Sequence, residues 1–219
     1  MTSRRGRLIT FEGGEGAGKS TQVRRLVSRL LEHGVSVLAT REPGGSPFAE
    51  RLRDVLLSGS MSGLGSAGEA LLFTAARIDH VDTAIAPALA AGRFVVCDRY
   101  VDSTRAYQGA LGAIDPGLIG AFERVSVGPN RPDLTVLIDV PAEIGLARAA
   151  ARRAQAEADR FESRDMAYHG RLRRAFLDIA EAEPARFLVV DGARASEEIA
   201  DEVWRDVNIR FLEPIRRAS

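Results

Sequence analysis

The stretch Leu8–Thr21, LITFEGGEGAGKST, decides the fold of this chain. It opens with the apolar run Leu8–Phe11, which predicts a buried strand, and it passes through a glycine-rich turn into a helical pattern that begins at Lys19. Positions Gly13–Ser20 match the pattern G-x-x-x-x-G-K-S. Glycines let successive backbone N–H groups point inward at a phosphate chain, and the helix N-terminus adds partial positive charge. The order of strand, loop and helix therefore predicts a site for a nucleoside triphosphate.

Two side chains of this loop are suited to act on the phosphates. Lys19 is the only lysine in a chain whose Lys+Arg total is 30, so we infer that its position needs a compact ammonium, and we expect it at the β- and γ-phosphates. Ser20 offers a hydroxyl to the Mg²⁺ that accompanies ATP. The predicted ATP- and phosphate-binding residues are Gly13, Gly14, Glu15, Gly16, Ala17, Gly18, Lys19, Ser20 and Thr21.

Short apolar runs and helical segments alternate along the rest of the chain. The predicted strands are Leu8–Phe11, Val35–Thr40, Phe94–Asp98, Leu134–Val140 and Phe187–Val190. The predicted helices are Lys19–His33, Pro47–Leu57, Ala67–Ala91, Pro116–Val125, Ala142–Ala158, Arg164–Glu183 and Ser196–Phe211. The strands are nearly continuous in apolar residues, which is typical of strands buried on both faces. We therefore expect an α/β protein with the three-layer P-loop NTPase fold, in which helices flank a five-stranded parallel sheet.

Composition bounds the organisation and the surroundings of the protein. The 219 residues show no repeat and no linker, so we expect a single domain over residues 1–219. Thirty basic and thirty acidic residues cancel, which argues against a nucleic-acid partner, and no apolar run approaches the roughly 18 residues of a membrane span. The lone Cys97 cannot form an internal disulfide, and the apolar run after the basic N-terminus is too short for a signal peptide. We expect a cytoplasmic protein.

The phosphate loop by itself leaves the reaction open. A regulatory GTPase normally carries the guanine-reading motif N-K-x-D, and this chain cannot, because Lys19 is its only lysine. A mechanical or partitioning ATPase remains an alternative, because Leu134–Asp139 (LTVLID) has the form of an aliphatic run that ends in an acidic residue. A small-molecule kinase fits as well, whether it acts on a nucleotide or on another metabolite.

A second group of polar residues predicts a site for an acceptor. Asp98 and Arg99 end the third predicted strand, at the carboxyl edge where α/β sheets bind their ligands. Arg99 can bind a phosphate bidentately, and Asp98 can hold Mg²⁺ or orient Arg99; the alternative is an ion pair that only closes the strand. Phe73 and Arg77 are spaced i, i+4 and share a helix face, although a lone Phe on a helix is more often a core residue.

Four motifs together resemble bacterial thymidylate kinase. They are FEGGEGAGKS at Phe11–Ser20, TREPGG at Thr40–Gly45, LFTAAR at Leu72–Arg77 and DRYVDSTRAYQ at Asp98–Gln108. The segments Arg131–Thr135 and Asp159–Glu162 also fit, so the resemblance runs from about Leu8 to Asp191. It implies transfer of the γ-phosphate of ATP to dTMP, with Mg²⁺, giving dTDP and ADP in dTTP biosynthesis.

The resemblance also implies roles for individual residues. Phe73 would stack on thymine, Arg77 would bind a base carbonyl, and Arg99 would hold the acceptor phosphate. The substrate-binding residues it implies are Glu15, Arg41, Pro43, Phe73, Arg77, Arg99, Ser103, Thr104, Tyr107 and Gln108. Among them Tyr107 would pack on the sugar, and Glu15 would lie near its 3′-hydroxyl. The residues expected at the metal are Ser20 and Asp98.

The Ala-rich, charged segment over residues 147–162 is expected to form a lid. Some members of the family carry a basic residue where this chain has Gly16, so the positive charge must come from elsewhere. We expect Arg152 first, and Arg148 or Arg153 second, to close over the transferred phosphate, the alternative being a solvated helix. The predicted catalytic residues are Lys19, Arg152, Arg153, Arg148, Arg99 and Glu15. Apolar residues on the helix Ala67–Ala91, together with the resemblance, predict a homodimer.

Overall fold

A single parallel sheet forms the centre of the computed structural model, which describes residues 5–58, 63–153 and 164–214. Its strands lie in the order β2-β3-β1-β4-β5, and every neighbouring pair is parallel. They are β1 (Leu8–Glu12), β2 (Val37–Arg41), β3 (Phe94–Asp98), β4 (Leu134–Asp139) and β5 (Phe187–Asp191). The predicted five-stranded parallel sheet is confirmed. The second strand begins two residues later than the pattern predicted, because Val35 packs as part of the turn that follows α1.

The helices α1 to α9 connect and cover the strands. They are α1 (Lys19–Glu32), α2 (Pro47–Leu57), α3 (Ser66–His80), α4 (Ala86–Ala90), α5 (Val101–Thr104), α6 (Pro116–Val127), α7 (Ala142–Arg153), α8 (Met166–Ala182) and α9 (Ser196–Val207). Side-chain caps fix several starts: Ser46, Asp115 and Asp165 each accept a hydrogen bond from a backbone N–H of the first turn. No helix within the described ranges is long and apolar enough to cross a membrane.

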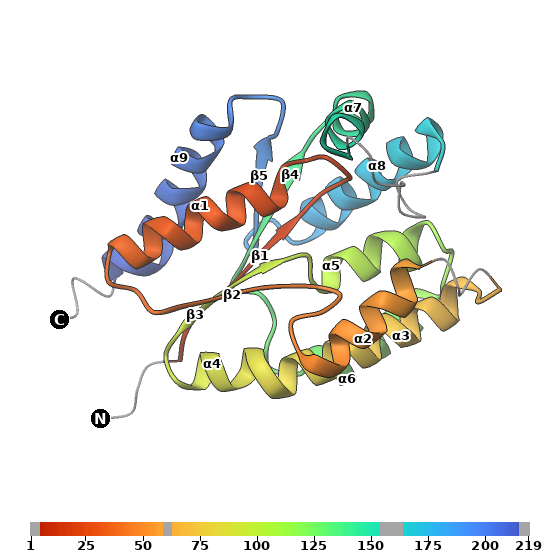
Figure 1. Cartoon of the computed structure of the whole chain (residues 1–219), viewed down its shortest axis with the longest axis horizontal. Helices are drawn as coiled ribbons and strands as arrows, with labels where there is room; N and C mark the ends of the chain where they lie inside the picture. The colour runs from red at the N-terminus through yellow and green to blue at the C-terminus, as the bar shows by residue number, and fades with distance from the viewer. Residues whose placement is uncertain (1–4, 59–62, 154–163, 215–219) are drawn as a thin grey trace.

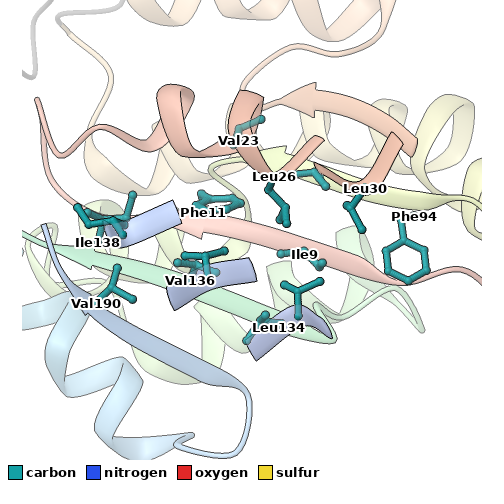
Figure 2. Close-up of a cluster of buried hydrophobic side chains, with 14 of the residues drawn as sticks. Ile9, Phe11, Val23, Leu26, Leu30, Phe94, Leu134, Val136, Ile138 and Val190 are labelled. Atoms are coloured by element: carbon teal, nitrogen blue, oxygen red, sulfur yellow. The ribbon is translucent and has the colours of Figure 1, made fainter. Parts of the chain in front are cut away.

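The core lies in two layers, one on each face of the sheet. Strand β1 alternates between them: Ile9 and Phe11 face α1 and α9, whereas Leu8 packs with α4 and α6. Figure 2 shows Leu26 and Leu30 of α1 directed at the side chains of β1 and β4. Figure 1 shows the same arrangement as helices on both sides of the strands. The result is the three-layer architecture that the alternating pattern predicted.

Two helical segments differ from the sequence-based expectation. The helix predicted over Ala67–Ala91 is divided, because a π-helical stretch, Val81–Ile85, separates α3 from α4. Pro87 has no N–H to continue the regular ladder, and the N–H of Ala86 already bonds to the carbonyl of Val81. After β3, where no helix was predicted, α5 continues into a second π-helical stretch, Arg105–Ala110.

A third π-helical stretch, Asn208–Leu212, ends the predicted helix Ser196–Phe211. The predicted helix Ala142–Ala158 is described as far as Arg153. Its remaining residues lie outside the described part of the chain.

Candidate active site

A cavity of about 270 Å³ opens at the carboxyl edge of the sheet, beside β1, β2 and β3. All the residues predicted to bind the acceptor line it. They are Glu15, Arg41, Pro43, Phe73, Arg77, Arg99, Ser103, Thr104, Tyr107 and Gln108. Lys19, Ser20 and Asp98 line the same cavity, so the structure brings most of the predicted phosphate-loop residues to the acceptor residues, whereas Gly13, Gly14 and Thr21 lie outside the lining.

The phosphate loop is closely covered by the start of α7. Gly16 has φ +67°, and a Cβ at this position would lie 1.9 Å from the carbonyl oxygen of Gly145. From the other side, a Cβ on Gly145 would lie 2.4 Å from the carbonyl oxygen of Glu15. Any side chain at position 16 therefore needs α7 to move. The basic residue that some family members carry there does not fit this chain.

Lys19 lies across the phosphate loop as the first residue of α1. Its Nζ donates hydrogen bonds to the carbonyl oxygens of Gly13 (2.9 Å) and Gly14 (2.7 Å). Burial, followed by the positive charge of Arg99, lowers the pKa of the Lys19 ammonium to about 8. A phosphate in the loop would replace these carbonyl oxygens with charged partners.

Ser20 and Asp98 supply adjacent oxygen atoms at the other side of the loop. The Ser20 hydroxyl donates to the Asp98 carboxylate at 2.5 Å. One hydroxyl and one carboxylate oxygen are hard donors that suit Mg²⁺, an ion that keeps several waters and binds substrate phosphates. The donor set therefore fits Mg²⁺ carried in with ATP. The described residues hold no cluster of three or more His, Cys, Asp or Glu that would bind a metal without substrate.

Arg99 faces the phosphate loop from the end of β3. Its Nη2 donates to the Glu15 carboxylate at 2.6 Å, and Nη1 donates to the carbonyl oxygen of Gly13 and to Ser103 Oγ, both at 3.3 Å. Tyr107 adds its hydroxyl to the same Glu15 oxygen at 2.8 Å. Burial raises the pKa of Glu15, but the positive charges of Arg99 and Lys19 outweigh it and hold the pKa at about 2. Glu15 is therefore ionised and keeps Arg99 beside the loop.

Arg77 lines the same cavity and is held by a buried carboxylate. Its Nε donates to Glu42 at 2.7 Å, and Nη2 donates to Thr104 Oγ1 at 3.1 Å. His80 contacts the second Glu42 oxygen at 3.2 Å, and its other ring nitrogen contacts Thr40 Oγ1 at 2.7 Å. Within the described residues Nη1 makes no hydrogen bond, which leaves one donor edge of a fixed guanidinium for a ligand. The half-buried Phe73 lines the same cavity as Arg77.

Comparison with known proteins agrees with this geometry. The thymidylate kinase family pattern matches residues 11–203. The chain belongs to the thymidylate kinase family. It is 55% identical to the thymidylate kinase of Rhodopseudomonas palustris (strain ATCC BAA-98 / CGA009) over 99% of this chain and 95% of that one. For the thymidylate kinase of Bradyrhizobium diazoefficiens the identity is 53%, over 96% and 92%.

A solved structure supports the same family. The crystal structure of thymidylate kinase from Ehrlichia chaffeensis superposes with a TM-score of 0.75 at 34% identity, and it covers 93% of this chain and 99% of its own. The chain is thus an enzyme, a dTMP kinase of the α/β P-loop class, as its motifs predicted. This membership decides against the partitioning ATPase. The acidic residue of that alternative, Asp139, is bound bidentately by Arg173 at 2.6 and 2.8 Å.

The predicted lid of this thymidylate kinase falls partly outside the described residues. Residues 147–153 continue α7, and the side chains of Arg152 and Arg153, together with residues 154–163, are not described. Arg148 donates to the carbonyl oxygens of Gly192 (2.7 Å) and Ala193 (3.4 Å), in the loop between β5 and α9. Its guanidinium is therefore engaged at that loop, while the catalytic role expected of the lid arginines stays a prediction.

Sequence reasoning missed several residues of the thymidylate kinase cavity. Glu42, Arg53, Leu57 and Tyr100 also line it. Glu12, at the end of β1, is fully buried and bonds to the turn that carries Arg99. Glu12 directly follows a predicted strand and Glu42 lies two residues beyond another, and this position at the carboxyl edge is the signal that pointed to Asp98. The pattern did not show that they face inward.

Proposed function

We propose that this cavity binds dTMP with its base at Arg77 and Phe73 and its phosphate at Arg99, so that the γ-phosphate of ATP in the loop is transferred to it. The observation that carries this proposal is one cavity lined by two arginines, each fixed by a carboxylate. Arg77 is held by Glu42, and Arg99 is held by Glu15 beside the phosphate loop. An aromatic face with a few placed polar groups is how a small flat base is bound.

The phosphate loop supplies positioning and charge for the transfer. Backbone N–H groups of Gly13–Ser20 would donate hydrogen bonds to the phosphates of ATP. The Lys19 ammonium, which donates to the carbonyl oxygens of Gly13 and Gly14 in the structure, would then donate to oxygens of the β- and γ-phosphates instead. Phosphoryl transfer needs little covalent help from the protein, so in-line placement and cationic groups account for most of the catalysis. Arg99, which contacts Gly13 and Glu15 of the loop, would lie between the two phosphates and neutralise charge on the acceptor.

Mg²⁺ is proposed to enter with ATP and to lie at Ser20 and Asp98. When bound, the ion neutralises charge on the transferred phosphate. Ser20 would provide a hydroxyl oxygen, and Asp98 at the end of β3 would accept hydrogen bonds from the waters of the ion. The single domain, the homodimer and the cytoplasmic location remain predictions from the sequence.

Selectivity for thymine would follow from the donor character of Arg77. A carbonyl on the base accepts from the free guanidinium edge, whereas the exocyclic amine of cytosine presents a second donor and leaves Arg77 unpaired. Thr104 and Gln108 lie along the same cavity and would read the adjacent base edge. Tyr107 would pack on the sugar, where its hydroxyl is already held by Glu15.

A nucleotide panel tests this proposal. Purified protein is mixed with ATP, Mg²⁺ and dTMP, dCMP, dGMP or UMP, and ADP is measured. We expect kcat/KM for dTMP to exceed that for dCMP by roughly 10–100-fold, since one unpaired buried donor costs on the order of 1–3 kcal/mol. Phe73→Ala should raise KM for dTMP and leave KM for ATP nearly unchanged. Equal activity on dCMP and dTMP would contradict the base site.

A further inference from the structure

Glu12 is a buried carboxylate that the phosphate loop itself does not use. It ends β1 one residue before Gly13, and its side chain is fully buried. One carboxylate oxygen accepts the backbone N–H of Tyr100 at 2.7 Å and that of Ser103 at 3.2 Å. The other accepts the Ser103 hydroxyl at 2.7 Å. A side chain of the first strand thus binds the turn that follows the third strand at three points.

That turn holds Arg99 in an unusual backbone conformation. Arg99 has φ +66°, in the left-handed region that non-glycine residues rarely adopt. Such a conformation persists only where the surroundings over-determine it. The Arg99 N–H bonds to the carbonyl oxygen of Phe11 at 2.9 Å, and Glu12 fixes the next residues, Tyr100 and Ser103. Contacts to the end of β1 therefore hold the turn on both sides of the strained residue.

The direction of the Ser103 hydroxyl proton determines whether the Ser103 oxygen can accept a hydrogen bond from Arg99. A serine hydroxyl has one proton and two acceptor lone pairs. Because that proton is donated to Glu12, the oxygen faces Arg99 Nη1, which donates to it at 3.3 Å. Glu12 therefore acts on the guanidinium in two ways, through the backbone of the turn and through Ser103.

We propose that Glu12 is the positioning residue for the acceptor phosphate, because its carboxylate locks the Arg99–Ser103 turn and turns the Ser103 oxygen toward the Arg99 guanidinium. This proposal rests on the proposed function, in which Arg99 binds the phosphate of dTMP. Glu12 does not line the cavity and touches no substrate. Its effect on dTMP would pass through the turn that it holds, chiefly through Arg99.

The alternative is a carboxylate that only stabilises the fold. Both roles predict a lower melting temperature when Glu12 is changed, so stability does not separate them. The affinity for thymidine separates the two roles, because thymidine has the base and sugar of dTMP but no phosphate for Arg99 to hold. A positioning residue for the phosphate affects dTMP and leaves thymidine unchanged, whereas a loosened fold weakens both ligands.

The experiment measures the Kd of dTMP and of thymidine by calorimetry for wild type, Glu12→Gln, Arg99→Ala and the double variant. It is run at pH 8, because burial raises the pKa of Glu12 to about 7 and the carboxylate form is the one that accepts the Ser103 proton. Glutamine keeps the shape of the Glu12 side chain. Where Glu12 accepts the proton of the Ser103 hydroxyl, the amide nitrogen of glutamine would donate a hydrogen bond to the Ser103 oxygen. We expect Glu12→Gln to weaken dTMP about tenfold and to change thymidine less than about twofold. In the Arg99→Ala background the same substitution should change the Kd of dTMP less than about twofold, since the group it acts through is gone.

Glu42→Gln is the matched control, because it also neutralises a buried carboxylate at a strand end that holds a cavity arginine. It acts on Arg77 at the base end, so it should weaken dTMP and thymidine alike. Equal losses of both ligands in Glu12→Gln, no loss of either, or additive losses with Arg99→Ala would overturn the proposal.

A second variant and an activity assay separate the possible causes of a negative result. If Glu12→Gln does not fold, Ser103→Ala removes only the hydroxyl, and it must show the same preference for weakening dTMP and the same non-additivity with Arg99→Ala. A wild-type protein that forms no ADP with dTMP would contradict the proposed function itself. A wild type that binds and phosphorylates dTMP, with thymidine weakened as much as dTMP in Glu12→Gln, would contradict only the role of Glu12.

Discussion

At the scale of single residues, two arginines that line the cavity are each paired with a carboxylate. Arg77 faces Glu42, and Arg99 faces Glu15, at 2.7 and 2.6 Å. Unpaired buried charges are costly, so these pairs let two arginines stay fixed in the absence of ligand. A nucleotide phosphate then binds an arginine that a carboxylate already holds in place, so the arginine is preorganised for the ligand.

Lys19 gives the first residue-scale prediction. Lys19→Ala should lower kcat at least about 100-fold, because charge that develops on the transferred phosphate loses its cationic partner. Lys19→Arg should be nearly as poor, since a planar guanidinium does not fit where Nζ lies between the carbonyl oxygens of Gly13 and Gly14. Steady-state kinetics with saturating ATP and dTMP measures both. Near wild-type activity of Lys19→Arg would show that the loop does not hold phosphate in this way.

Glu12 gives a second prediction, on stability. Burial, with the nearby negative charge of Asp102, raises the pKa of Glu12 from 4.5 to about 7. Folding therefore favours the protonated carboxyl: its contribution to the unfolding free energy is complete below pH 4.5 and is lost as the pH rises through about 7. Between pH 5 and pH 8 the unfolding free energy of wild type should fall relative to that of Glu12→Gln. Denaturant titrations of both proteins at the two pH values measure this difference.

The comparison with Glu12→Gln removes the contribution of all other titrating groups. Any group common to both proteins cancels in the difference, provided that the substitution leaves its surroundings intact. A constant difference across this pH range would mean that Glu12 does not change its ionisation there on unfolding.

At the scale of elements, the periodic patterns predicted the strands, whose positions depend on buried apolar faces. They missed the elements whose form depends on one or two particular contacts. The five strands are each rich in branched apolar residues, and all five lie where the sequence predicted them to within about two residues. The π-helical turn before α4 depends on Pro87 and on one shifted hydrogen bond, which leave the apolar period of the segment unchanged. Helix α5 is only four residues long and depends on Glu12 from another strand, so no local pattern identifies it.

The contact between α7 and the phosphate loop gives the element-scale prediction. A methyl group on Gly145 would lie 2.4 Å from the Glu15 carbonyl, so Gly145→Ala must displace either the loop or the first turn of α7. A displacement of reacting groups by about 1 Å can cost up to about 100-fold, and we expect kcat/KM for ATP to fall about tenfold. Steady-state kinetics with varied ATP measures it.

Gly170→Ala is the matched control for this substitution. It lies within α8, where an added Cβ meets nothing within 4 Å. Replacing a helix-interior glycine there should raise stability by about 0.5–1 kcal/mol and leave the kinetics unchanged. Wild-type kcat/KM for ATP in Gly145→Ala would mean that the loop tolerates the displacement.

At the scale of the whole molecule, the topology explains why so much of the site was predictable. The parallel order β2-β3-β1-β4-β5 brings the ends of β1, β2 and β3 to one edge, so motifs about 30 and 60 residues apart along the chain meet at a single cavity. Most residues that line the cavity stand in those motifs, whereas Arg53 and Leu57 of α2 do not. Glu12 and Glu42 were missed because their partners, the turn after β3 for Glu12 and Arg77 for Glu42, come from other motifs, and a sequence does not record such pairs.

The last prediction concerns closure of the molecule over its substrates. The phosphate loop has no room for a cation at Gly16, and Arg148 is engaged with the carbonyl oxygens of Gly192 and Ala193. We therefore expect Arg152 to supply the positive charge at the transferred phosphate, an effect worth ~10³-fold or more in kcat. Arg152→Ala should cut kcat steeply while the melting temperature and the Kd of dTMP hardly move, since a lid residue acts only in the closed state. Arg148→Ala is the matched control on the same helix, and its loss of kcat should be much smaller. If Arg148→Ala, Arg152→Ala and Arg153→Ala each leave kcat within about threefold of wild type, these arginines serve only to solvate an Ala-rich helix.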